Sequence, residues 1–97
     1  MDIESLKEHI LENNLIPVVL EELDCHHIKH KDGFFQCANP DGDNYTAVCV
    51  YENTNLTTIN YTRDITNGRK SSDLISLVEF YKKESFPYAV KWICDVL

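Results

Sequence analysis

The chain has 97 residues, of which 43% are hydrophobic and 26% charged, and its net charge is −7 at pH 7. This length supports one domain with a single core, and this composition excludes a disordered or fibrous protein. No apolar run approaches the ~20 residues that a membrane-spanning helix needs, so we expect one domain over residues 1–97 with no membrane partner.

Two short helices are expected at the start of the chain. Leu6 and Ile10 recur at helical spacing behind Asp2, which is suited to cap the first helix. Ser5, with a glutamate three residues later, is a second start of capping-box form. Pro17 suits the first turn of a second helix that continues to about residue 23.

The middle of the chain predicts strands. Residues 25–30 and 34–37 are expected to pair across a turn at Asp32-Gly33, because Asp-Gly is a strong hairpin signal. Residues 45–51 alternate between two faces, as strands do. Residues 56–63 are rich in threonine, isoleucine and tyrosine, which favour a further strand.

Two helices are expected at the end of the chain. Residues 64–71 are polar and read as a connector, after which Ser71 or Ser72 is suited to cap a helix. Ser85 and Pro87 then begin a last helix. The fold class is therefore predicted as α+β, a small antiparallel sheet of about four strands flanked by two N-terminal and two C-terminal helices.

This order of elements resembles the N-terminal zinc-binding, or zinc-ribbon, domain of bacterial and phage DNA primases. The matching segments are LIPVVLEELDCHHIKHKDGFFQC, CANPDGDNYTAVCVY, LTTINYTRD and SSDLISLVEFYKKESFPYAVKWICDVL, so the resemblance covers about residues 14–97. It implies a phage or other mobile-element protein that acts in DNA replication. Because the polymerising domain of primases has no room in this chain, it implies an accessory domain and not an enzyme.

The same resemblance places the four zinc-ligand positions of the family on Cys37, Pro40, Asn60 and Arg63. Only Cys37 keeps the ligand of the family, and a tetrahedral zinc site needs four nitrogen, sulfur or oxygen ligands. The resemblance therefore implies a degenerate, metal-free site. We expect no cofactor, and we expect the apolar helices to stabilise the sheet in place of the metal.

Nucleic-acid binding is the function that the resemblance implies, because the sheet of the family touches single-stranded template. The predicted partner is single-stranded DNA or a replication protein, bound by the face of residues 29–37 and 59–70. Aromatic rings beside basic residues can stack bases and follow phosphates. The expected strands carry the aromatic residues Phe34, Phe35, Tyr45, Tyr51 and Tyr61. The predicted binding residues are Lys29, Lys31, Tyr61, Arg63, Arg69 and Lys70.

A cluster of histidine and cysteine precedes the sheet, at Cys25, His26, His27, His30 and Cys37. On a regular strand, residues 25 and 27 face one side and residue 30 the other, so the side chains would not converge on a metal. A histidine-rich exposed strand with buried cysteines is the favoured interpretation. No cysteine has a base arranged to activate it as a nucleophile, which also argues against an enzyme.

Negative charge is concentrated in the first 24 residues, which hold seven acids and one base. An acidic total opposes non-specific nucleic-acid binding, but the nearly neutral remainder leaves room for a local basic surface. The alternative function is a protein-interaction module that uses the acidic N-terminal helices. The N-terminus lacks the basic start and apolar core of a secretory signal, which predicts a cytoplasmic protein with free thiols.

Overall fold

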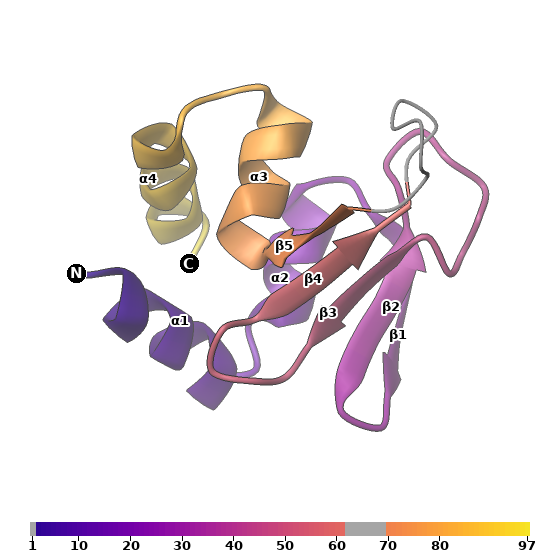
Figure 1. Cartoon of the computed structure of the whole chain (residues 1–97), viewed down its shortest axis with the longest axis horizontal. Helices are drawn as coiled ribbons and strands as arrows, with labels where there is room; N and C mark the ends of the chain where they lie inside the picture. The colour runs from indigo at the N-terminus through magenta and orange to yellow at the C-terminus, as the bar shows by residue number, and fades with distance from the viewer. Residues whose placement is uncertain (1, 62–69) are drawn as a thin grey trace.

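The computed structural model describes residues 2–61 and 70–97. Within these residues the chain forms four helices and a five-stranded sheet (Figure 1). In chain order they are α1 (Ile3–Glu12), α2 (Ile16–Glu22), β1 (His26–Lys31), β2 (Phe34–Ala38), β3 (Val48–Tyr51), β4 (Thr57–Asn60), β5 (Lys70–Asp73), α3 (Leu74–Lys82) and α4 (Phe86–Val96). The strands lie in the order β1-β2-β3-β4-β5, each antiparallel to its neighbours. The predicted α+β class and the two pairs of flanking helices are confirmed.

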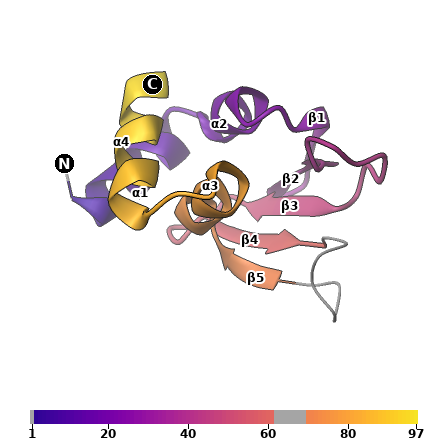
Figure 2. The same cartoon turned by 90° about the horizontal axis from the view of Figure 1, so that it is seen from above.

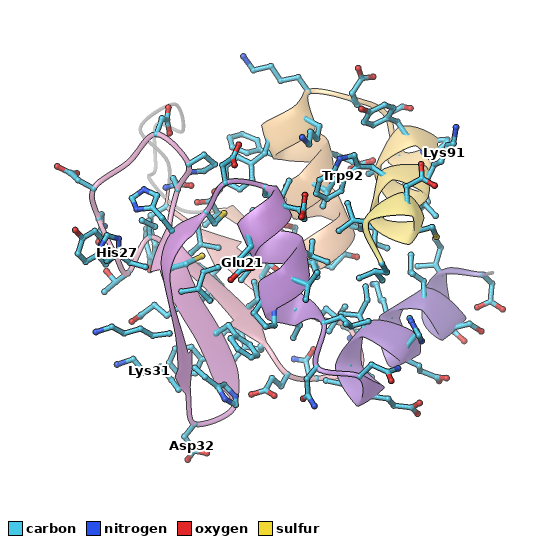
Figure 3. All side chains as sticks on the ribbon, turned by 180° about the vertical axis from the view of Figure 1, so that it is seen from behind. Glu21, His27, Lys31, Asp32, Lys91 and Trp92 are labelled. Carbon is cyan, nitrogen blue, oxygen red and sulfur yellow. The ribbon has the colours of Figure 1, made fainter. Side chains whose placement is uncertain are left out.

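The helices cover one face of the sheet. Seen from behind, α2 lies across the sheet (Figure 3), and α3 follows β5 directly and packs on β4 and β5. The last helix, α4, packs against α3 and α2 in a second layer farther from the sheet (Figure 2). No helix in the described ranges is long and apolar enough to cross a membrane.

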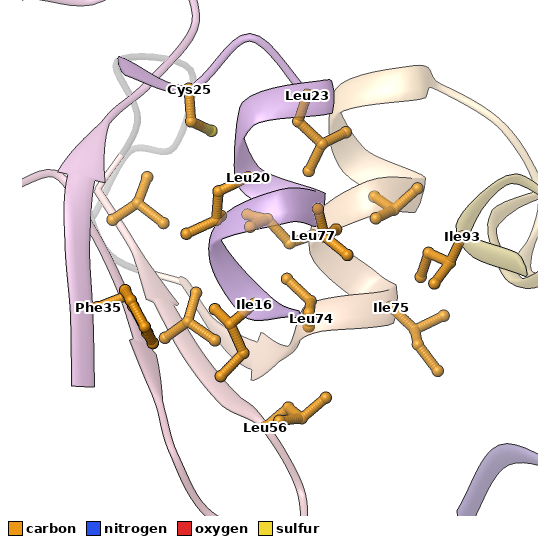
Figure 4. Close-up of a cluster of buried hydrophobic side chains, with 14 of the residues drawn as sticks. Ile16, Leu20, Leu23, Cys25, Phe35, Leu56, Leu74, Ile75, Leu77 and Ile93 are labelled. Carbon is orange, nitrogen blue, oxygen red and sulfur yellow. The ribbon is translucent and has the colours of Figure 1, made fainter. Parts of the chain in front are cut away.

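The core lies between the sheet and the helices α2 and α3 (Figure 4). Leu20 of α2 and Leu74 of α3 are fully buried, as is Val50 at the centre of the sheet. Ile93 extends this core into α4. Burying a Leu, Ile or Val side chain contributes about 1.5–3 kcal/mol each, so the packing of these helices stabilises the sheet.

The predicted helix starts are confirmed in part. The backbone N–H of Ser5 donates to Asp2 Oδ1 at 2.7 Å, so Asp2 is the N-cap of α1. Pro17 stands in the first turn of α2, as predicted. The predicted caps Ser71 and Ser72 of the third helix are wrong, because both lie in β5.

The fifth strand is the main departure from the prediction. Its first two residues were expected in a polar connector and the next two at the start of the third helix, and its sequence KSSD has no apolar residue that would indicate a strand. It forms because its backbone pairs with β4, from Thr57 opposite Asp73 to Asn60 opposite Lys70. The third strand begins at Val48, three residues later than expected, and leaves Tyr45 in the preceding turn.

Asp73 joins the sheet to two helices. Its Oδ1 accepts the backbone N–H of Ser76 at 2.8 Å, which caps α3, and its Oδ2 accepts from Lys7 Nζ of α1 at 2.8 Å. Burial alone would raise the pKa of the Asp73 carboxyl, but the bonds from Lys7 and Ser76 outweigh it, so the pKa is lowered. The charged carboxylate therefore stabilises the fold.

Replacing Asp73 by asparagine keeps a good cap and removes the charge, so we expect a loss of about 1 kcal/mol of unfolding free energy at pH 7. Because the folded pKa is depressed, the carboxylate contributes stability above its unfolded pKa of about 3.9, and this contribution is lost as pH falls through the folded value. Urea unfolding at pH 7 and pH 3 checks this. The difference between wild type and variant should shrink at pH 3, and a constant difference would contradict the ion pair's role.

Candidate nucleic-acid interface

The two faces of the sheet differ sharply in burial. On the face toward α2 and α3, Cys37, Val48 and Val50 are fully buried. Residues one position along each strand point to the opposite face and are only half-buried. We call this second surface the open face, and it comprises Lys29, Lys31, Phe34, Gln36, Cys49, Tyr51, Thr57 and Ile59.

Two aromatic rings lie together on the open face. Phe34 and Tyr51 are register partners on β2 and β3, and their ring centroids are 5.5 Å apart at an interplanar angle of 42°. The neighbouring row carries Gln36 and Cys49, with the Gln36 amide donating to the sulfur of Cys49 at 3.8 Å. The centre of the open face is thus a small, half-exposed aromatic surface with a polar amide beside it.

The predicted basic residues are only partly brought together. Lys29 and Lys31 are both exposed on β1 and, two residues apart, share the open face next to Gln36 and Phe34. Lys70 begins β5 at the other edge of the sheet. Four strand spacings separate these edges, about 19 Å. Arg63 and Arg69 lie outside the described residues.

Tyr61 follows the last residue of β4 and is 46% exposed. It lines a cleft of about 960 Å³ between the loop of residues 39–47 and the end of α3. Tyr81 and Lys82 of α3 line the same cleft from the other side. The tyrosine predicted to bind nucleic acid is therefore accessible, but it lies at the end of the sheet and away from the lysines of β1.

The positions that the primase resemblance assigns to zinc ligands, where the structure describes them, lie toward one end of the sheet. The strands β2 and β4 run in the same direction, so the loops that follow them, with Pro40 after β2, leave from the same end. Cys37 and Asn60 both pair with Val48 and share the covered face with one strand between them. Two strand spacings put the backbones of Cys37 and Asn60 about 10 Å apart. At this separation their side chains cannot both bind one metal ion unless the structure changes.

A hydrogen-bonded chain joins this end of the sheet to α3. The Tyr81 hydroxyl donates to Asn39 Oδ1, and Asn39 Nδ2 donates to the carbonyl oxygen of Tyr61 at 3.0 Å. Asn39 follows β2 and Tyr61 follows β4, so one amide links the two strand ends. We call Asn39, Tyr61 and Tyr81 the asparagine clip. Burial raises the pKa of Tyr81, with Cys25 and Cys37 adding to the shift, so the hydroxyl keeps its proton and remains a donor.

Cys25 and Cys37, near this end of the sheet, are both buried. Hydrogen bonding with the Cys25 thiol, together with burial, raises the pKa of the Cys37 thiol, so it stays protonated at neutral pH. Buried thiols of this kind are poor nucleophiles and poor metal ligands. In residues 2–61 and 70–97, no group of three or more histidine, cysteine or acidic side chains could hold a metal ion.

Phe34 and Tyr51 were named from the sequence among the strand aromatics that can stack bases, and the predicted face of residues 29–37 includes Phe34, but neither is one of the six predicted binding residues. The segment FFQCA does not show which phenylalanine faces the helices. The structure pairs Phe35 with the buried Val50 and leaves Phe34 beside Tyr51. The alternation of residues 48–51 was the available signal, because it separates Val48 and Val50 from Cys49 and Tyr51.

No protein-family model matches this sequence, and neither a curated protein nor a solved structure matches it. The resemblance to primase zinc-binding domains therefore remains a prediction that rests on the residues themselves.

Proposed function

We propose that this protein is a non-catalytic domain that binds single-stranded nucleic acid on the open face of its sheet, as an accessory to a replication protein. The observation that carries the proposal is the pair of rings of Phe34 and Tyr51 on a helix-free sheet surface, with Lys29 and Lys31 alongside. Nothing in this arrangement suggests bond-making chemistry.

The rings supply affinity that does not depend on base sequence. Every base has a flat face, and stacking on an aromatic side chain contributes about 1–3 kcal/mol per base. Phe34 and Tyr51 are half-buried, so each side chain keeps some surface accessible to a base. Gln36 lies in the next row, where its amide can pair with a base edge.

The lysines supply charge at the edge of the same surface. Residues two apart on a strand are separated by about 6.6 Å, a distance that suits neighbouring phosphates of an extended single strand. The acid at the β5 end, Asp73, is already paired with Lys7. The net charge of −7 arises mainly from the first 24 residues, which form α1, α2 and their connections rather than the open face.

Fluorescence anisotropy with a labelled 15-nucleotide oligo-dT tests this function. We expect saturable binding at 50 mM salt that weakens at 200 mM, with a log–log slope of roughly −0.7 for each phosphate contact. Lys29→Gln should make the slope shallower by about that amount. Lys91→Gln, which removes an exposed lysine on α4, should leave the slope unchanged.

Absence of binding at tens of micromolar protein would contradict the proposal and favour the alternative, a protein-interaction module. One observation supports that second function. All seven acids of residues 2–24 are exposed, and none of them forms an ion pair in the described part of the chain. On this alternative, a lysine-rich peptide would bind the protein where oligo-dT does not.

A further inference from the structure

The first strand of the sheet is irregular at its second residue. His26 pairs with Ala38 and Lys29 pairs with Gln36, so the register shifts between them and β1 contains a bulge. His27 has a φ of 55°, in the left-handed region that non-glycine residues seldom adopt. In a regular strand His26 and His27 would point to opposite faces, so their rings would not meet.

The bulge brings the two imidazole rings together. The Nδ1 atoms of His26 and His27 lie 3.0 Å apart. His27 is exposed and His26 is half-buried, so the pair is open to solvent at the outer edge of the sheet, where Figure 3 shows His27. A neutral imidazole has one N–H and one lone pair, so this contact requires a proton on one Nδ1 and a lone pair on the other. A metal ion can replace that proton and accept both lone pairs.

The ring of Tyr45 holds this arrangement in place. Tyr45 stacks on His27 with centroids 3.6 Å apart and an interplanar angle of 14°, and it meets His26 edge-on at 6.3 Å. Tyr45 lies in the turn before β3 and is 48% exposed, but these contacts fix the position of its ring. Rings that are already oriented lose less conformational entropy when they bind a ligand.

We propose that His26 and His27 form a two-histidine site for a divalent transition-metal ion, with water completing the coordination. Imidazole nitrogens bind such ions at about 2.0–2.1 Å, so nitrogens 3.0 Å apart subtend an angle of about 90° at the metal. This angle matches neighbouring positions of a square-planar or octahedral ion, which favours Ni²⁺ or Cu²⁺ over tetrahedral zinc. The site is distinct from Cys37, Pro40, Asn60 and Arg63, and it does not depend on nucleic-acid binding.

Calorimetric titration of the untagged full chain with Ni²⁺ at pH 7.5 tests the site. Nickel is the better probe because Cu²⁺ can oxidise thiols, and Cys94 is exposed. We expect one equivalent to bind, and His26→Asn and His27→Gly each to weaken the apparent affinity at least tenfold. His9→Asn is the matched control, because it removes an exposed histidine on α1, and it should bind like the wild type.

The two variants guard against a folding artefact. Glycine adopts a positive φ without strain, so His27→Gly should keep the bulge while it removes the imidazole. Thermal unfolding of each variant confirms that it is folded before titration. The proposal is overturned if the wild type shows no saturable binding at 1 mM Ni²⁺, or if both variants bind Ni²⁺ as tightly as the wild type does.

Discussion

Tyr81→Phe is expected to lower the free energy of unfolding by about 1–2 kcal/mol, although it removes a single oxygen atom. The Tyr81 hydroxyl donates to Asn39 Oδ1, and Asn39 in turn donates to the Tyr61 carbonyl oxygen. Without the hydroxyl, Asn39 loses a partner at a half-buried position, and an unsatisfied polar group costs more than the bond itself contributes. For a domain of this size the fall in Tm should be roughly 4–16 °C.

Tyr88→Phe is the matched control for this prediction. Tyr88 lies on α4, is 43% exposed, and has no hydrogen bond through its hydroxyl among the described contacts. The same chemical change there should alter stability by less than about 0.5 kcal/mol. Thermal and urea unfolding of both variants measures the difference. If Tyr81→Phe is as stable as Tyr88→Phe, the asparagine clip does not hold the strand ends together.

The asparagine clip explains how the ends of β2 and β4 are held together. In small domains a structural zinc ion joins two loops and contributes folding free energy outright. Here Asn39 joins the ends of β2 and β4 through hydrogen bonds, and Tyr81 anchors it to α3. Buried side chains of all four helices pack with those of the sheet in one core, which also stabilises the fold.

Tyr51→Leu should weaken binding of single-stranded oligonucleotides about 5- to 100-fold, and Phe34→Leu should have an effect of similar size. Leucine keeps an apolar side chain of moderate size on the sheet but cannot stack a base. Because Tyr51 and Phe34 pack against each other, their effects should not add. The double variant should therefore lose less than the product of the two single losses.

Tyr88→Leu supplies the control, since it removes an exposed tyrosine from α4, away from the open face. Its affinity for oligo-dT should equal that of the wild type. Circular dichroism confirms that each variant is folded at the temperature of the titration. If Tyr51→Leu binds as tightly as Tyr88→Leu, the rings of the open face do not contact the nucleic acid.

The sequence predicted the helices and the central strands because their apolar residues follow helical or alternating periods. Leu6 and Ile10 recur on one face of α1, and Val48 and Val50 alternate along β3. In each case the residues that carry the pattern are those that become buried. Local periodicity is enough to predict a helix or strand when one face of that element packs on the core.

Other features depended on partners that are distant in the chain. The fifth strand has a polar sequence and is set by its pairing with β4. The bond between Asn39 and Tyr81 joins residues 42 positions apart, and no local pattern indicates it. The bulge at His27 reverses the facing that a regular strand predicts, so the histidine pair could not be derived from alternation.

The structure brings only some of the predicted binding residues together, for the same reason. Lys29 and Lys31 are two apart on one strand, so their common face follows from the strand period. Which face of the sheet the helices cover is decided by packing, and that choice leaves Phe34 and Tyr51 accessible rather than Phe35. From the sequence, residues 29–37 and 59–70 were assigned to one binding face, whereas Lys31 and Lys70 lie on opposite edge strands of the sheet.

Side-chain NMR during titration with oligo-dT tests the open face most directly. The Gln36 amide and the Ile59 methyl groups lie on the open face, whereas the methyl groups of Leu20 and Ile75 lie in the covered core. Binding as proposed shifts the signals of Gln36 and Ile59 in a saturable way and leaves those of Leu20 and Ile75 in place. Shifts confined to residues of α1 and α2, or no shifts at all, would contradict it.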